Sequence, residues 1–195
     1  MATIGATYHE HMARALPGQW GDTSAYNIDG ACVVGKPDGG EVSKPDSGKV
    51  GKPDGGEVGD IYVGAAVQHG GVDAMGNKLI KPMAKSGKAY GVAIRSHFQT
   101  VSKNGRMVYE NGGGINVMTK GRVWMLCNKP EKTAPTFGEA VKLDTDGTVK
   151  LDTDGTVKLD ADGTVEAEGA IETTWTFTGD YTAFGDLQLV EVQVK

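Results

Sequence analysis

The stretch from Ile115 to Cys127 alternates between two sets of side chains. A period of two is the signal of a β-strand, whose successive side chains point to opposite faces of a sheet. One face carries Val123, Met125 and Cys127, and the other carries Arg122, Trp124 and Leu126. The pattern predicts two β-strands joined at Lys120-Gly121, with a cation at the turn.

Other segments also have strand patterns. Residues 31–34 form a short apolar run, and residues 60–67 place Ile61, Val63, Ala65 and Val67 at alternate positions. Near the end of the chain, residues 171–178 alternate strictly, and a second run covers 187–194. In that last run the apolar phase changes between Leu189 and Val190, which predicts a β-bulge there.

The beginning of the chain has a helical period instead. Tyr8, Met12 and Leu16 recur at four-residue spacing before Pro17-Gly18, which predicts a helix of two to three turns that ends at the proline. So short a helix is not stable alone and has to dock on another surface. His9 and His11 point away from each other on such a helix, which argues against a metal site.

Two tandem octapeptide repeats interrupt the strand patterns. The first, residues 35–58, repeats Gly-Lys-Pro-Asp-Gly-Gly-Glu-Val with small variations. Its Pro-Asp-Gly core is turn chemistry, and only one valine per unit offers apolar surface. Three valines do not offset the ordering entropy of the segment, so it is either a ribbon that leans on a partner or a mobile loop.

The second repeat, residues 141–164, is built on Val-Lys-Leu-Asp-Thr-Asp-Gly-Thr. Each unit divides into a short strand and an Asp-Thr-Asp-Gly turn, and the even period keeps Val and Leu on one face. This predicts a small meander that needs a partner surface. Because the units are alike, the meander can slip by one whole unit. Residues 141–170 carry a formal charge of −5, which equals the net charge of the whole chain.

These patterns predict a mainly β fold, a small β-barrel or sandwich-like domain with a short N-terminal helix or arm and two repeat insertions. Glycine, 30 of 195 residues, is about twice its usual share of roughly 7%, as short strands with tight turns require. The expected divisions are an arm and first strand (1–34), the first repeat (35–58), a central β domain (59–140), the acidic repeat (141–170) and a terminal strand pair (171–195). Cys32 and Cys127 stand in no metal spacing and are expected to be reduced thiols.

Composition and motifs give little support to catalysis or to nucleic-acid binding. A net charge of −5 provides no electrostatic attraction for a polyanion, and no apolar window approaches a membrane span of roughly 18 residues. The start of the chain has no signal-peptide pattern. Ser96 and His97 are neighbours on a strand and point apart, so they do not form a nucleophile and base pair. We therefore expect no enzyme activity and no cofactor.

The acidic repeat carries the strongest candidate metal ligands. Its aspartates stand beside glycines and have the oxygen chemistry that calcium prefers. The calcium-loop pattern is incomplete, however, and Asp-Gly turns explain the same residues, so turns are the favoured interpretation. The candidate calcium ligands are Asp144, Asp146, Asp152, Asp154, Asp160 and Asp162.

Three segments resemble a known family. Residues 90–97 (Tyr-Gly-Val-Ala-Ile-Arg-Ser-His), residues 116–124 (Asn-Val-Met-Thr-Lys-Gly-Arg-Val-Trp) and residues 138–144 are similar to segments of the structural cement, or capsid decoration, proteins of tailed bacteriophages. The resemblance implies a non-enzymatic virion protein that is made in the host cytoplasm and clamps the major capsid protein on the outer capsid surface. It also implies a homo-oligomer, a dimer or a trimer.

The resemblance suggests which residues make contact with a partner. Trp and Arg dominate interface hot spots, so Lys120, Arg122 and Trp124, together with Tyr8 and Trp20, are the expected capsid or subunit contacts. Two alternatives stay open: the strand residues hold the sheet together, and the N-terminal segment packs on its own domain instead of lying on a neighbour. A second function class is a calcium- or carbohydrate-binding module of a phage tail or adhesin.

Overall fold

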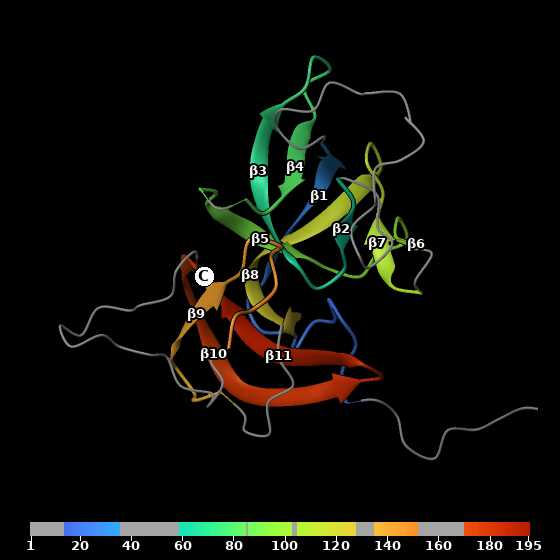
Figure 1. Ribbon diagram of the computed structural model, residues 1–195. Coiled ribbons are helices and arrows are strands. Elements are labelled where there is room, and N and C mark those ends of the chain that lie inside the picture. The colour runs from blue at the N-terminus through green and yellow to red at the C-terminus, as the bar shows by residue number, and fades with distance from the viewer. Residues whose placement is uncertain (1–13, 36–58, 85, 103–104, 128–134, 152–169) are drawn as a thin grey trace, which may run out of the picture.

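The computed structural model describes residues 14–35, 59–84, 86–102, 105–127, 135–151 and 170–195 (Figure 1). The described part contains strands and turns and no helix. The strands are β1 (Asn27–Val34), β2 (Ile61–Tyr62), β3 (Ala66–Val72), β4 (Lys78–Pro82), β5 (Ala89–Ala93), β6 (Thr100–Val101), β7 (Met107–Tyr109), β8 (Gly114–Cys127), β9 (Ala140–Leu143), β10 (Ile171–Phe184) and β11 (Leu187–Val194). The predicted mainly β, barrel-like fold class is confirmed.

The first half of β8 belongs to a closed barrel. The strand order β1-β4-β3-β5-β8 returns to its start because β1 also pairs with β8, where Ile28 lies opposite Met118. Closing the ring leaves no unpaired edge among these five strands. A small second sheet, β2-β7-β6, lies beside this barrel, in the upper right of Figure 1.

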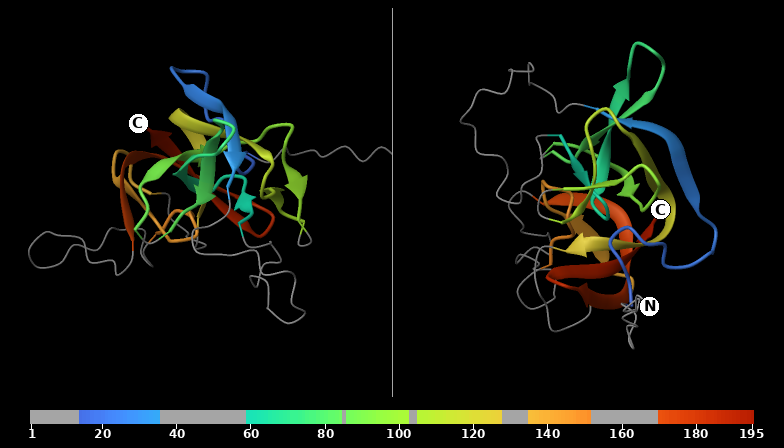
Figure 2. Two further views of the ribbon diagram at one scale, coloured as in Figure 1. Left: turned by 90° about the horizontal axis from the view of Figure 1, so that it is seen from above. Right: turned by 90° about the vertical axis from the view of Figure 1, so that its right-hand side faces the viewer.

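The second half of β8 belongs to another set of strands, in the order β8-β11-β10-β9. Val149 closes this set, because it bridges Leu143 of β9 on one side and Cys127 of β8 on the other. The molecule is therefore two small barrels that share one long strand. Figure 2 shows the green and yellow strands of the first barrel next to the red strands of the second from two further sides.

β8 changes barrels at Gly121. The backbone there has a φ of 124°, which L-residues rarely adopt, and a Cβ would lie 2.9 Å from the Cβ of Tyr26. The prediction of two strands joined at Lys120-Gly121 is wrong in one respect: β8 is a single continuous strand, and the chain does not reverse. Glycine at this position bends the strand and does not form a hairpin turn.

Each barrel has an apolar core, and the two cores follow the predicted alternation. Val123 and Met125 of β8 are fully buried with Trp175 and Phe177 of β10 in the second barrel. Val117, from the first half of β8, is buried with a different cluster in the first barrel. Because the strand bends at Gly121, its side chains point in different directions before and after this residue. One strand can therefore contribute side chains to both cores.

The expected strand over residues 60–67 is wrong. Gly64 has a φ of 89° and divides the segment into β2 and β3, which belong to different sheets. Continuous apolar alternation hid the break because both sides of the turn are buried: Ile61 and Val67 are 2% and 0% exposed.

The expected bulge between Leu189 and Val190 is also wrong. Pairing of β11 with β8 runs without interruption through these residues, and the irregularity lies on the partner strand, between Phe177 and Tyr181 of β10. Leu189 and Val190 are both fully buried because the two faces of β11 pack on different apolar clusters. The apparent change of phase arises because the charged residue Glu191 follows Leu189 on one face of β11, whereas Val190 and Val192 lie on the other face.

Several predictions fall mainly on residues outside the described part. Most of the predicted N-terminal helix, up to residue 13, lies outside the described part. Its last residues, 14–16, are described and are not helical. The first repeat and the acidic repeat beyond Leu151 also lie outside it. In the described part, Cys32 is buried and Cys127 half-buried, in different apolar clusters, and neither forms a disulfide. No helix there is long and apolar enough to cross a membrane.

Candidate partner-binding surface

The predicted contact residues lie where the N-terminal segment meets β8. Residues 18–21 run along the free edge of the second half of this strand. Gly18 N donates to Trp124 O (2.8 Å), Trp124 N donates to Gln19 O (2.9 Å), and Gly21 N donates to Arg122 O (2.8 Å). These bonds fix the segment as an extra short strand, so the residues it displays are held on a rigid base.

Trp124 lies under this segment and not on the surface. Its side chain is 5% exposed and packs with Ala15, Leu126 and Leu189. The guanidinium of Arg14 lies 5.9 Å from the ring centroid, and Arg14 also pairs with Asp180 of β10. In this structure Trp124 joins the N-terminal segment to the second barrel, which agrees with the alternative that it holds the sheet together.

Trp20 and Tyr26 lie together on the surface near the backbone of Lys120, and we call these three residues the Trp20 patch. Trp20 is 36% exposed, Tyr26 is 47% exposed and Lys120 is exposed. The rings of Trp20 and Tyr26 are 4.8 Å apart at their centroids. Lys120 lies opposite Asn27, the neighbour of Tyr26, across the pairing of β1 and β8. The patch therefore combines a tilted aromatic pair with a nearby cation.

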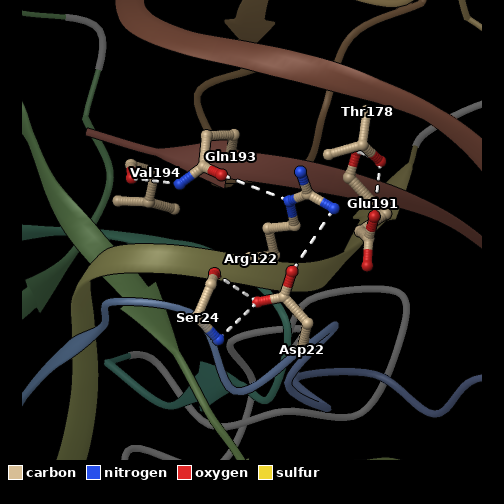
Figure 3. Close-up of polar contacts among 7 residues, drawn as sticks. All are labelled: Asp22, Ser24, Arg122, Thr178, Glu191, Gln193 and Val194. Atoms are coloured by element: carbon tan, nitrogen blue, oxygen red, sulfur yellow. Dashed lines mark hydrogen bonds and ion pairs between the residues drawn. The ribbon is translucent and has the colours of Figure 1, made fainter.

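Arg122 lies beside the patch in a polar cluster (Figure 3). Its guanidinium is 3.3 Å from Asp22 Oδ2, and its Nε donates to Gln193 Oε1 at 3.3 Å. Hydrogen bonds from the side chain and backbone of Ser24 lower the pKa of Asp22, so this carboxylate stays charged opposite Arg122. The Arg122 side chain is 41% exposed and so remains open to a partner on one side.

Glu191 lies behind this cluster as a buried carboxylate, 6% exposed. The hydroxyl of Thr178 donates to its Oε2 at 2.6 Å. Sequence reasoning missed Glu191, Asp22 and Tyr26. The spacing of Asp22 and Ser24 is that of an Asx-turn, which is a signal present in the sequence, whereas no local pattern predicts that Tyr26 lies against Trp20.

A second polar cluster lies in the first barrel, around Asp29 of β1. Asp29 Oδ2 accepts hydrogen bonds from Lys78 Nζ (2.5 Å) and from the Tyr90 hydroxyl (2.7 Å). Burial tends to raise the pKa of Asp29, but the bonds from Lys78, Tyr90 and Cys32 outweigh it and bring the pKa to about 2. Burial and the nearby carboxylate raise the pKa of both Cys32 and Tyr90 to about 12. The cluster binds β1, β4 and β5 together and contains no activated nucleophile.

Of the candidate calcium ligands, the structure describes Asp144 and Asp146, and both serve their own turn. Asp144 Oδ1 accepts from Thr145 N at 2.7 Å, and Asp146 Oδ1 accepts from Thr148 N at 2.8 Å. The four other candidate aspartates lie outside the described part. Within the described ranges, no group of three or more His, Cys, Asp or Glu side chains is placed to hold a metal ion.

A cavity of about 370 Å³ lies between the small sheet β2-β7-β6 and the second barrel, lined by Pro17, Tyr62, Arg106 and Leu126 among others. Its walls are mostly apolar, and Arg106 lies 5.6 Å from the centroid of the Tyr62 ring. Arg95 and Asp186 are further charged residues in its lining. These side chains do not include a nucleophile next to a general base, so the lining does not indicate a reaction. Tyr8, the remaining predicted contact residue, lies outside the described part.

Comparison with known proteins identifies the family. A family model described as structural cement protein (E217 gp24/Pam3 gp6) matches residues 4–195. The chain belongs to the structural cement protein family. The resemblance seen in residues 90–97, 116–124 and 138–144 is thus confirmed. Membership in this family implies a structural role in the virion and not a catalytic one.

A solved structure has a similar fold. It is titled "The capsid of Myoviridae Phage XM1", and the similarity covers 100% of this chain and 98% of that one, with a TM-score of 0.55 and 15% sequence identity. At this identity the likeness shows the fold alone. A comparison with curated proteins finds no match. The cement protein is therefore known by its family and by its architecture.

Proposed function

We propose that this cement protein binds the major capsid protein on the outer surface of the capsid, and that the Trp20 patch with Arg122 is a contact surface. The observation that carries the proposal is an exposed aromatic pair beside two cations on a rigid strand of a structural cement protein. Tryptophan, tyrosine and arginine are the residues that contribute most at protein interfaces.

The construction of the surface supports this role. Trp20 stands on the segment that is hydrogen-bonded to β8, and Arg122 is held by Asp22 and Gln193. Side chains that are already ordered lose less conformational entropy when a partner binds. A partner with an apolar recess and a nearby carboxylate would complement the patch, because Lys120 provides a positive charge and Arg122 adds a second one that Asp22 partly balances.

Reinforcement of a shell follows from many such contacts. A subunit that bridges neighbouring capsid proteins, and is itself a dimer or a trimer, converts modest single contacts into strong overall attachment. A closed symmetric oligomer fits such a lattice, because each copy presents the same surface. We propose that the acidic repeat faces outward or toward a basic region of a neighbour. Nucleic acid and membranes have no part in this proposal.

The test is co-sedimentation with capsids of the phage that encodes the protein. The double variant Trp20→Ala/Lys120→Glu removes one aromatic ring and reverses one charge of the patch. Loss of a hot-spot residue costs about 2 kcal/mol or more, so the variant should bind at least tenfold more weakly. Met75→Ala is the control, because Met75 is 87% exposed and lies in the turn between β3 and β4. Figure 1 shows this turn at the end of the first barrel that is farther from β9, β10 and β11.

The outcomes separate the parts of the proposal. Saturable binding by the intact protein supports capsid binding, and selective loss in the double variant supports the Trp20 patch. If both variants bind as well as the intact protein, the contact surface lies elsewhere. If the intact protein does not sediment with capsids, the capsid-binding proposal fails. Sedimentation velocity of the free protein measures whether it is a dimer or a trimer.

A further inference from the structure

Residues 141–151 complete the second barrel, and we call them the closing segment. Its first part, β9, pairs with β10, with Leu143 opposite Ile171. It then turns and returns, so that Val149 lies between Leu143 and Cys127. Val149 N donates to Leu126 O at 2.8 Å, and Lys150 N donates to Lys142 O at 2.9 Å. Without this segment, β8 and β10 would each have an open edge.

The closing segment is also part of the core. Val141, Leu143 and Val149 are fully buried, and Leu151 is 4% exposed. All four belong to the cluster around Trp175. The turn between them docks on the first barrel, because Ala66 N donates to Gly147 O at 2.8 Å. The segment is therefore bound on both sides and on its inner face.

The chain contains this segment twice. Residues 141–151 read Val-Lys-Leu-Asp-Thr-Asp-Gly-Thr-Val-Lys-Leu, and residues 149–159 read the same. Each hydrogen bond and each apolar contact of the first copy is therefore available to the second. Only the connections differ: residues 152–169 lead from the closing segment to Ala170 in the first arrangement, whereas the second arrangement has two connections, residues 141–148 and residues 160–169. The second arrangement closes one connection more than the first, so it is the less populated of the two. Because the entropy of closing a loop changes slowly with its length, the difference is smaller than the cost of losing a buried leucine side chain.

We propose that the site between β8 and β10 is a strand-acceptor site that either of these two identical segments fills, residues 141–151 or residues 149–159. The exchange shifts the strand by eight residues and leaves the core unchanged. The exchange also changes where the remaining acidic residues attach to the barrel. In the first arrangement they all lie in one connection that ends at Ala170, and in the second they are divided between one connection after Ala140 and one before Ala170. This inference does not depend on capsid binding.

The thiol of Cys127 provides a direct test, since Cys127 forms a β-bridge with Val149 and forms no disulfide in the described part. Val149→Cys should give an intramolecular disulfide with Cys127 in the first arrangement. Val157→Cys should give one only in the second. Val165→Cys is the matched control: it has the same eight-residue spacing, but the shift that brings it to Cys127 places Ala167 at the position of Leu151.

The expected result is that Val157→Cys becomes oxidised within one chain at least tenfold faster than Val165→Cys, as measured by non-reducing gels and peptide mass mapping. Equal rates for the two variants would overturn the exchange, because general unfolding exposes both thiols alike. A disulfide between two chains would overturn exchange within one chain. Deletion of residues 149–156 brings Val157 next to Cys127 in the first arrangement, so the cysteine variant of that deletion is a positive control for geometry.

A pair of core substitutions provides an independent equilibrium measurement. The second arrangement excludes Leu143 from the core but still uses Leu151. Leu143→Ala should therefore lower the Tm by less than half as much as Leu151→Ala, although Leu143 is the more buried of the two. Equal losses would contradict the proposal. Leu→Val at both positions is the milder pair if Leu151→Ala does not fold. When residues 149–156 are deleted, only one copy of the segment remains, so Leu143→Ala should lower the Tm as strongly as substitution of any other core leucine in the segment.

Discussion

Gly21 lies directly over the buried carboxylate of Glu191, and a Cβ at Gly21 would be 1.9 Å from Glu191 Oε1. The absence of a side chain at this position lets the N-terminal segment approach β11 while Glu191 keeps its hydrogen bond from Thr178. The contact joins the partner-binding surface to the second barrel. This close contact is one reason why residues 18–21, which have no hydrophobic core of their own, are held firmly against the second barrel.

Gly21→Ala should therefore destabilise the protein by about 1–3 kcal/mol, because the added methyl group displaces either the segment or a buried carboxylate. Urea unfolding followed by circular dichroism measures the change. Gly30→Ala in β1 is the matched control, since a Cβ there would meet only Asn116 Oδ1, at 3.4 Å. The control should change stability by less than about 1 kcal/mol. If both variants lost the same free energy of unfolding, the close contact between Gly21 and Glu191 would not be a particular source of stability.

Trp124→Ala should cost about 3–5 kcal/mol of stability, as expected for a buried aromatic residue. Trp20→Ala should lower the Tm much less than Trp124→Ala, because Trp20 is 36% exposed and therefore loses less apolar burial. Thermal unfolding of the two variants compares the roles directly. If Trp124→Ala were as stable as the intact protein, Trp124 would not join the N-terminal segment to the barrel, and its interpretation as an interface residue would regain weight.

Gly121→Ala should destabilise the protein more than Gly138→Ala. Both glycines have a positive φ, so each alanine variant pays about 1–2 kcal/mol for an unfavourable backbone. At Gly138 the added methyl group enters open space, whereas at Gly121 it lies 2.9 Å from the Cβ of Tyr26 and 3.2 Å from Met118 Sδ. We expect about 1–3 kcal/mol of additional loss at Gly121, measured by chemical unfolding. Equal losses would mean that the bend between the barrels tolerates a side chain.

Asp29 should make stability depend on pH in the acid range. Its folded pKa of about 2 lies below the value of about 3.9 in an unfolded chain, so its contribution is fully present above about pH 4 and is lost as the pH falls through about 2. The difference corresponds to about 2 kcal/mol at pH 7, since the Asp29 side chain is only 11% exposed.

Asp29→Asn should remove about this amount at pH 7 and flatten the fall in stability between pH 4 and pH 2. Urea unfolding at several pH values measures both effects. Asp180→Asn breaks the exposed ion pair with Arg14 and should cost at most about 1 kcal/mol at pH 7. An unchanged acid dependence in Asp29→Asn would show that other carboxylates cause the loss of stability.

The sequence by itself determined the class of fold and the faces of the strands. Alternation in residues 171–178 predicted which side chains are buried, because a strand has only two faces and the apolar face packs into the core. In the second half of β8 alternation separated the two faces but did not predict that both are buried, as Trp124 and Met125 are. The family resemblance was likewise readable from local segments. The pattern failed where both faces are buried: at Leu189 and Val190, and across the turn at Gly64. At these positions the apolar residues do not indicate which face of the strand packs on a given core, because both faces are covered.

Only the tertiary structure decided which elements share a barrel and which side chains remain on the surface. Trp20 and Trp124 are both tryptophans beside polar residues, yet one is exposed and the other is covered, because residues 18–21 pair with the edge of β8. The same holds for the acidic repeat. Its sequence shows identical units, but only pairing with β8 and β10 places Val149 in the core. Contacts between residues distant in the chain depend on closure of both barrels around β8, and no local pattern encodes that closure.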